Sequence, residues 1–142
     1  MRTPPLGRLL ILSFFVAATS ACAGGDAEPA PASVSFVEPA DGATVGSDVS
    51  VALEVSGVEI APSSDTRPGT GHHHVFIDES VSPAGQPIPQ GQANVRHFGT
   101  GATEFVLEDL PPGQHRLIAV IGDWEHVPVG EVAADTINIT VQ

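Results

Sequence analysis

The stretch Val49-Ser50-Val51-Ala52-Leu53-Glu54-Val55-Ser56 decides the fold of this chain. Its large apolar side chains recur at every second position, and small or polar residues fill the places between them. Because successive side chains of a strand point to opposite faces, this period of two predicts a half-buried β-strand. No segment from Ser33 onward keeps the 3.6-residue period of an amphipathic helix. The sequence therefore predicts an all-β domain.

Similar short strands are predicted on both sides of that stretch, separated by turns rich in Gly and Pro. They fall at residues 34–37, 73–78, 104–110, 115–121 and 136–141. The segment Ser80 to Asn94, rich in Pro, Gly and Gln, is interpreted as a crossover loop with room for one weak further strand. Six or seven short strands with such turns predict an immunoglobulin-like antiparallel β-sandwich of about seven strands.

The first 22 residues are predicted to be a signal peptide. Arg2 and Arg8 precede an apolar run of about ten residues, which is too short for a bilayer span of ~20 residues. Thr19-Ser20-Ala21-Cys22 resembles a bacterial lipobox, in which Cys22 is lipidated and anchors the protein to the membrane. The alternative is ordinary cleavage after Ala23. Both predict export, either as a membrane-anchored lipoprotein or as a periplasmic or extracellular protein.

Residues 23–32 are predicted to be a flexible linker, and residues 33–142 to form the sandwich domain. Beyond the signal peptide the chain has three arginines, no lysine and 17 acidic residues, so its formal charge is 3 − 17 = −14. Such a charge repels phosphate backbones and excludes nucleic acid as a partner. It also favours solubility, which is a sufficient reason for the acidity.

Five of the six histidines lie in predicted loops or at the ends of predicted strands. His72-His73-His74 follow a Gly-rich turn, and His97 and His126 stand in later loops punctuated by Gly and Pro. On a strand His72 and His74 share one face, ~6.6–7 Å apart at Cα, while His73 points toward the core. In an immunoglobulin-like sandwich the loops before His72, around His97 and around His126 lie at one end. These four imidazoles are therefore predicted to meet.

The four histidines are candidate metal ligands, because imidazole is the commonest side-chain ligand. Asp123 is a candidate oxygen ligand, or a partner that fixes a histidine tautomer. The mature domain lacks Cys and Met, which disfavours Cu(I) and leaves Zn(II), Cu(II) or Ni(II). Two alternatives remain: a structural polar cluster, and a ligand-binding end without metal. Trp124 is a candidate contact residue or a lid over the histidines.

His115 is predicted to be structural. It follows a Leu-Pro-Pro-Gly turn, where sandwiches often carry a corner tyrosine bonded to upstream backbone. No nucleophile elbow, paired carboxylates or phosphate-binding loop can be recognised, so the chain is not predicted to be an enzyme. Two functions are open: a cell-envelope module that binds a divalent metal, or a metal-free domain that binds a protein or glycan.

Four strings in order resemble one bacterial family. They are Gly71-His72-His73-His74-Val75-Phe76-Ile77-Asp78, His97-Phe98-Gly99-Thr100-Gly101-Ala102-Thr103-Glu104, Leu110-Pro111-Pro112-Gly113-Gln114-His115, and Gly122-Asp123 with His126-Val127-Pro128. The family is the uncharacterised group catalogued as domain of unknown function 4399. The resemblance covers residues 33–142 and implies a small exported protein without an established activity.

Overall fold

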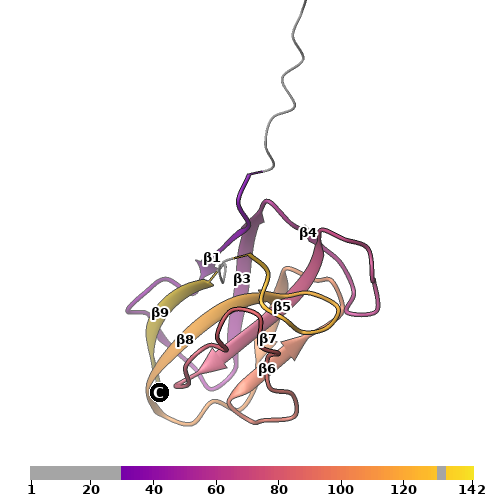
Figure 1. The fold of residues 1–142 in the computed structure, drawn as a ribbon. Coiled ribbons are helices and arrows are strands. Elements are labelled where there is room, and N and C mark those ends of the chain that lie inside the picture. Colours follow the sequence, from indigo (N-terminus) through magenta and orange to yellow (C-terminus); the bar gives the residue numbers. More distant parts are fainter. Residues whose placement is uncertain (1–29, 131–133) are drawn as a thin grey trace, which may run out of the picture.

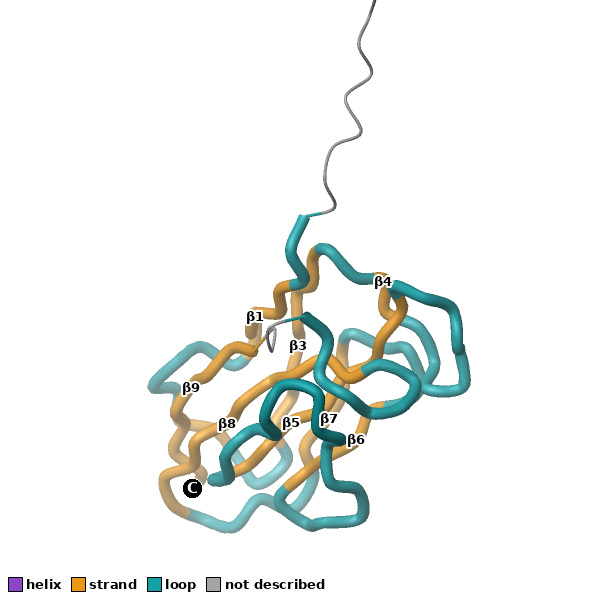
Figure 2. The backbone as a smooth tube through the Cα atoms, viewed as in Figure 1, coloured by secondary structure: helices purple, strands orange, loops and turns teal. Residues whose placement is uncertain are grey.

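The computed structural model describes residues 30–130 and 134–142. The predicted signal peptide, its Cys22 and most of the predicted linker lie outside these residues. The part that is described consists of strands, turns and loops (Figure 2). None of its segments is a helix long and apolar enough to cross a membrane.

Nine strands follow one another along the chain (Figure 1). They are β1 (Ser33–Glu38), β2 (Thr44–Val45), β3 (Val49–Ser56), β4 (Glu59–Ile60), β5 (Thr70–Ile77), β6 (Val95–Phe98), β7 (Glu104–Leu107), β8 (Gly113–Gly122) and β9 (Ala134–Val141). Seven have four or more residues, and β2 and β4 have two each.

The strands form two sheets. The smaller sheet has the order β1-β3-β7, and the larger has the order β2-β9-β8-β5-β4, with β6 also paired to β5. The larger sheet is strongly curled (Figure 1). This arrangement confirms the all-β prediction, while the immunoglobulin-like topology stays a prediction. The two shortest strands depart from a wholly antiparallel arrangement, because β2 pairs with β9 and β4 with β5 in parallel.

The main core lies between the two sheets. Val49, Val51 and Leu53 of β3 are buried, as the period of two predicts, while Ser50 and Glu54 are exposed. They pack in one cluster with buried apolar residues of the larger sheet, among them Val75, Leu117 and Ile139. At ~25 cal/mol per Å² of apolar surface removed from water, this burial is the main contribution to stability.

Strand β5 differs from β3 because both of its faces are buried. All eight of its residues are buried, and it lies between β8 on one side and β4 and β6 on the other. One face contributes Val75 and Ile77 to the main core. On the other face Phe76 belongs to a second apolar cluster, in which Ile88 comes from the crossover segment 80–94. That segment covers the outer face of the sheet.

Some strand bounds differ from the prediction. The strand expected at 73–78 begins earlier, at Thr70, and the one expected at 104–110 ends at Leu107. The crossover segment 80–94 holds no strand, and the additional strand is β6, directly after it. Strand β6 forms because β5 has a free edge there, and it brings His97 opposite His74.

Candidate metal centre

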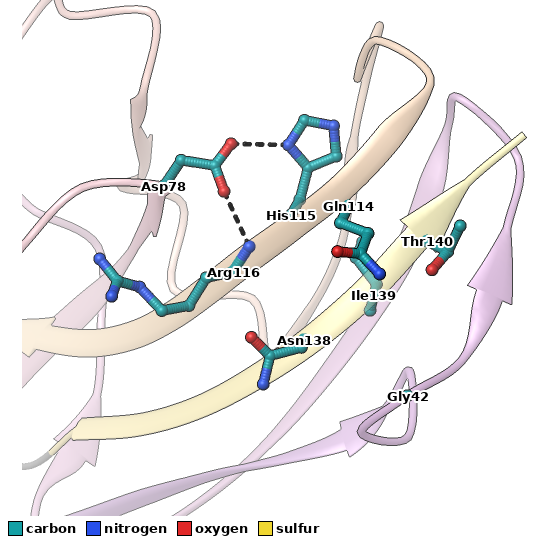
Figure 3. A pocket seen from close by; sticks show the side chains of 8 residues that line it. All are labelled: Gly42, Asp78, Gln114, His115, Arg116, Asn138, Ile139 and Thr140. Carbon is teal, nitrogen blue, oxygen red and sulfur yellow. Dashed lines mark hydrogen bonds and ion pairs between the residues drawn. The ribbon is translucent and has the colours of Figure 1, made fainter.

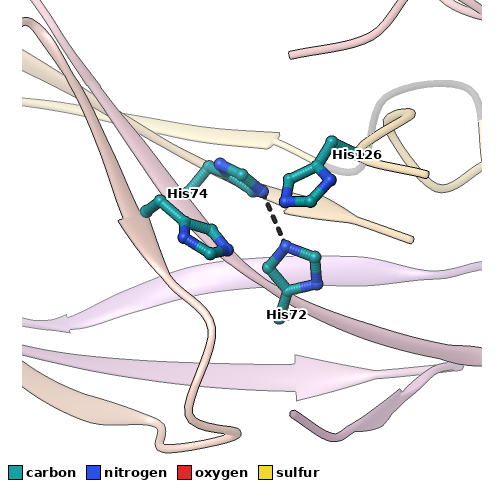
Figure 4. Close-up of side chains that lie close together, drawn as sticks. His72, His74 and His126 are labelled. Carbon is teal, nitrogen blue, oxygen red and sulfur yellow. Dashed lines mark hydrogen bonds between the residues drawn. The ribbon is translucent and has the colours of Figure 1, made fainter. Parts of the chain in front are cut away.

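Four histidines form a compact cluster on the outer face of the larger sheet. We call His72, His74, His97 and His126 the histidine cluster. Each offers one ring nitrogen, and these nitrogens all lie within 4.8 Å of one another. Figure 4 shows His72, His74 and His126 turned toward a common point. The cluster could hold a metal ion.

Strand pairing brings three of the four rings together. His72 and His74 are two residues apart on β5, so they project from the same face. His97 on β6 is directly opposite His74 in the antiparallel register, where side chains share a face and lie close. The sequence predicts His97 in a loop at one end of a sandwich. Its actual position is in a strand, and the register of β5 and β6 creates the contact.

The fourth histidine comes from the loop after β8. His126 has a positive φ of 63°, and its backbone N–H donates to the carbonyl of Asp123 over 2.9 Å. The Asp123 carboxylate accepts hydrogen bonds of 2.9 Å from the backbone N–H groups of Glu125 and Val127. Asp123 thus ties down the turn that presents His126. Its predicted role as an oxygen ligand stays a prediction, since its carboxylate is outside the set of convergent ligand atoms.

The six distances between ring centres are nearly equal. They range from 4.8 Å, for His72 with His74 and with His126, to 5.4 Å for His74 with His126. The other three pairs fall between these limits, at 4.9, 5.1 and 5.1 Å. Four points with six similar separations form a tetrahedron. Zinc bonded to four imidazoles at ~2.0–2.1 Å spaces their ring centres about 5.2 Å apart and their bonded nitrogens about 3.3 Å apart. The ring centres of the cluster have that spacing, and the nitrogens, which lie within 4.8 Å of one another, would turn inward to bind the ion.

The cluster has a buried side and an open side. His72 and His74 are 1% and 0% exposed, His126 is half-buried, and His97 is exposed. Two glycines leave space for the buried rings and their neighbours. A Cβ atom at Gly122 would lie 3.0 Å from His74 Nε2, and one at Gly99 would lie 2.8 Å from His97 Nε2. Any larger side chain at these positions would push a ring aside.

Burial keeps His72 and His74, the two buried histidines of the cluster, neutral at neutral pH. Desolvation, followed by the neighbouring histidines, lowers the pKa of His72 to about 4 and that of His74 to about 2. The pKa of His97 is also lowered, first by desolvation and then by His126. The charge of Asp123 acts weakly in the opposite direction on the pKa of His72. Neutral imidazole is the form that binds a metal, so few protons compete at neutral pH.

Two ring nitrogens of the cluster are buried without a hydrogen-bond partner. His126 Nε2 and His74 Nδ1 are in this state, whereas His74 Nε2 lies 3.0 Å from His72 Nε2. A buried polar atom without a partner is costly and calls for an explanation. A metal ion among the rings supplies a partner for His126 Nε2. The donor set and this unpartnered nitrogen therefore fit a bound ion.

His73 lies on the opposite face of β5, as the alternation predicts. It is fully buried, its ring centre lies 6.0 Å from that of Phe105, and neither of its ring nitrogens has a hydrogen-bond partner. Desolvation lowers its pKa to about 4. His73 is thus a neutral histidine within the apolar core, apart from the cluster.

His115 lies elsewhere on the same sheet, near the start of β8. Its Nδ1 is 2.7 Å from Asp78 Oδ2 (Figure 3). Its Nε2 is 2.8 Å from the carbonyl oxygen of Pro111. The other Asp78 oxygen accepts the backbone N–H of Arg116 at 2.8 Å. We call His115, Asp78 and Pro111 the His115 corner. The bond to upstream backbone confirms the structural contact predicted for this residue.

Trp124, which the sequence indicates as a contact residue or a lid, has a 48% exposed side chain in the loop beside Asp123.

Ile88 is a residue of the site that the sequence pattern did not identify. Its backbone N–H donates to the carbonyl of His126 at 2.7 Å, and its side chain would meet a Cβ at Gly122 at 3.1 Å. An isoleucine between two prolines in the crossover segment is the one signal that marks it.

Comparison with known proteins identifies the family of this chain. The family model described as Domain of unknown function (DUF4399) matches residues 51–142, which include the whole histidine cluster. No curated protein matches the chain. Among solved structures, the X-ray structure of the endo-beta-1,4-mannanase from Thermotoga petrophila is similar at a TM-score of 0.49 and 17% identity. The likeness covers 84% of this chain but 21% of that one, and nothing about activity follows from it.

Proposed function

The chain belongs to the family described as Domain of unknown function (DUF4399), a description that states no activity, and we propose from its site that the domain binds one divalent metal ion. The ligands are His72, His74, His97 and His126. The observation that carries this proposal is the set of six similar ring separations, 4.8–5.4 Å.

Zinc is the ion that this arrangement suits best. Tetrahedral coordination by nitrogen is usual for Zn(II), whereas Cu(II) and Ni(II) favour square-planar or tetragonal geometry. The rings of the histidine cluster surround a central point and do not lie around one plane, since three of the ring pairs meet at interplanar angles of 76° or more. Cu(II) is the second candidate, and it would have to distort its preferred geometry.

A binding role is favoured over catalysis. Structural zinc sites use four protein ligands, while catalytic zinc keeps one position for water or substrate. Four convergent imidazoles supply the full set, so no position is left for a substrate. The proposal that the protein is not an enzyme is supported by this closed set.

The location of the domain belongs to the same proposal. The apolar segment before Cys22 and the lipobox-like Thr19-Ser20-Ala21-Cys22 favour an exported cell-envelope protein with an N-terminal lipid anchor. An immunoglobulin-like sandwich is also proposed. It is supported by the strand orders β1-β3-β7 and β9-β8-β5, which correspond to the A-B-E and G-F-C orders of that fold.

The test is metal analysis of the protein purified without a histidine tag, followed by calorimetric titration with Zn(II) and Cu(II). We expect one zinc ion per chain. The folded protein should bind zinc more tightly than the same chain does when it is unfolded. His115→Gln is the matched control, because it removes a histidine outside the cluster. Binding of undiminished affinity after His72 and His74 are both replaced by Gln would contradict the proposal.

A second candidate function rests on Trp124. This side chain is 48% exposed beside the turn that presents His126, and tryptophan is enriched among residues that dominate protein contacts. In this alternative the domain binds a protein or glycan without metal. Thermal unfolding distinguishes the two functions, because a ligand bound only by the native state must raise the melting temperature. A melting temperature unaffected by EDTA and by added Zn(II) would favour the metal-free function.

A further inference from the structure

We infer that the metal ion is exchangeable cargo, which enters and leaves through the side of the histidine cluster where His97 lies. This inference rests on the proposed function, because it requires that the cluster binds metal. It goes further by assigning the ion a role: the domain carries the metal and can pass it on, and does not keep it as a permanent part of the fold.

The unequal burial of the ligands is the first observation. His72 and His74 are 1% and 0% exposed on a central strand, so they form the fixed floor of the site. His97 is exposed and His126 is half-buried. Four protein ligands fill the coordination sphere of a zinc ion, so an incoming donor can bind only as one of them leaves. His97 is the ligand that can leave without displacing the core, because it is exposed.

The elements that carry the outer ligands are the second observation. His97 belongs to β6, which has four residues and pairs only with β5 among the described strands. His126 lies in a turn held by Asp123 rather than in a sheet. Edge strands and surface loops open at lower free energy than central strands. The outer ligands can therefore move while the floor stays in place.

The third observation is that the ligand rings have few hydrogen-bond acceptors for their second ring nitrogen. Metal-binding histidines usually donate their second ring N–H to an acceptor, and loss of such a partner costs about 10–100-fold in affinity. Within residues 30–130 and 134–142, the one hydrogen bond recorded for the cluster's rings joins His72 to His74. His74 Nδ1 is buried without any partner. Tight, permanent retention of an ion would require acceptors that this part of the chain does not provide.

The fold does not depend on the ion. The main core consists of apolar side chains from both sheets, and the cluster lies on the other face of β5. An apolar cluster around Phe76 and Ile88 continues on that outer face beside the histidines. A small metal-dependent domain lacks such a core and unfolds without its ion. This domain is expected to remain folded when the site is empty.

Release is a ligand exchange at the open side. A donor atom of the acceptor forms a bond to the ion as the bond from the ion to His97 breaks. His97 leaves as a neutral imidazole, and the ion keeps its charge of +2. His126 and then the two floor ligands are replaced in the same way. No electron is transferred, and no covalent bond of the protein is broken.

The test is the rate of zinc release measured by stopped flow. The purified protein, loaded with one equivalent of Zn(II), is mixed with increasing excess of the chelating dye 4-(2-pyridylazo)resorcinol. We expect the release rate to rise with dye concentration, while circular dichroism shows that the empty protein stays folded. His97→Gln should release zinc about tenfold faster or more, and His115→Gln should match the wild type.

The outcomes that overturn the inference are distinguishable. If zinc is taken up but is not released to excess dye, or if the empty protein unfolds, the ion is structural and only this inference is wrong. A release rate independent of dye concentration would likewise overturn the entry of a donor beside His97. If the protein takes up no zinc at all, the proposed function is wrong and this inference is wrong with it.

Discussion

The histidine cluster and the His115 corner lie on one sheet, but their histidine rings differ in hydrogen bonding. Both ring nitrogens of His115 have an acceptor, Asp78 at 2.7 Å and the Pro111 carbonyl at 2.8 Å. In the cluster, among the residues that the structure describes, the rings make one hydrogen bond, between His72 and His74. A histidine held between two acceptors favours its charged form and holds the fold in place. Neutral histidines that face one another form a set of ligands.

The largest expected difference between the two regions concerns zinc affinity. The double change His72→Gln and His74→Gln removes the buried floor of the site, so we expect binding to weaken by ~10³-fold or more. The change His115→Gln, in the other region, should leave the affinity for zinc unaltered. Calorimetric titration of the three proteins measures this. Equal affinities in all three would show that the cluster is not the site.

The second difference concerns the pH dependence of stability in the metal-free protein. The pKa of His72 is lowered to about 4 and that of His74 to about 2, both first by desolvation. Below pH ~6.5 the unfolded chain therefore binds protons that the folded chain does not. The free energy of unfolding should fall as the pH drops from 6.5 toward 4, by about 2 kcal/mol for His72 alone.

Urea unfolding between pH 7.5 and 4.5 measures this dependence. The double change His72→Gln and His74→Gln should flatten the curve without abolishing it, because the pKa of His73 is also lowered to about 4 by desolvation. Parallel curves for the wild type and the double variant would contradict the assignment of neutral, coupled histidines to the cluster.

The third difference has the opposite sign. Burial lowers the pKa of His115, but its hydrogen bonds to Asp78 and Pro111 outweigh that effect, so the pKa is raised overall. The stabilisation it gives is complete below pH ~6.5 and is lost as the pH rises through the folded pKa. We expect His115→Gln to lower the free energy of unfolding by about 1–2 kcal/mol, and by more at pH 5.5 than at pH 8.

Proton NMR titration of the ring signals provides an independent check of that sign. The signals of His115 should shift above pH 6.5, and those of His72 and His74 well below it. If Asp78→Asn left the titration of His115 unchanged, the carboxylate would not be the cause of the raised pKa.

The smallest expected effect tests the space beside the cluster. A Cβ atom at Gly122 would lie 3.0 Å from His74 Nε2 and 3.1 Å from Ile88 Cδ1. We expect Gly122→Ala to weaken zinc binding about fivefold, or ~1 kcal/mol, by displacing His74. Gly46→Ala is the matched control, since a Cβ there meets nothing within 4 Å. Equal zinc affinity in both variants would show that Gly122 does not position the ring.

Local patterns in the sequence predicted much of the fold. The alternation from Val49 to Ser56 predicted β3 and its buried face, and the run after His72 predicted β5 with His73 on the core side. These predictions succeeded because one period of two decides both the strand and its faces. The short strand β6 was missed, since four residues carry too little periodicity to be distinguished from the loops around them.

The candidate site was predicted by its residues but not by its construction. The four histidines were expected to meet through three loops, whereas His97 reaches His74 by pairing of β6 with β5. His126 in turn is held by the crossover segment 80–94, where the backbone N–H of Ile88 donates to its carbonyl. Contacts between distant segments of this kind leave no local pattern in the sequence.

The most direct test of the account is zinc X-ray absorption spectroscopy on the loaded protein. If the histidine cluster holds the ion, the spectrum should show four nitrogen ligands at ~2.0–2.1 Å, with the outer-shell scattering typical of four imidazoles. A shell of six light atoms, or scattering from two imidazoles or fewer, would contradict a four-histidine site.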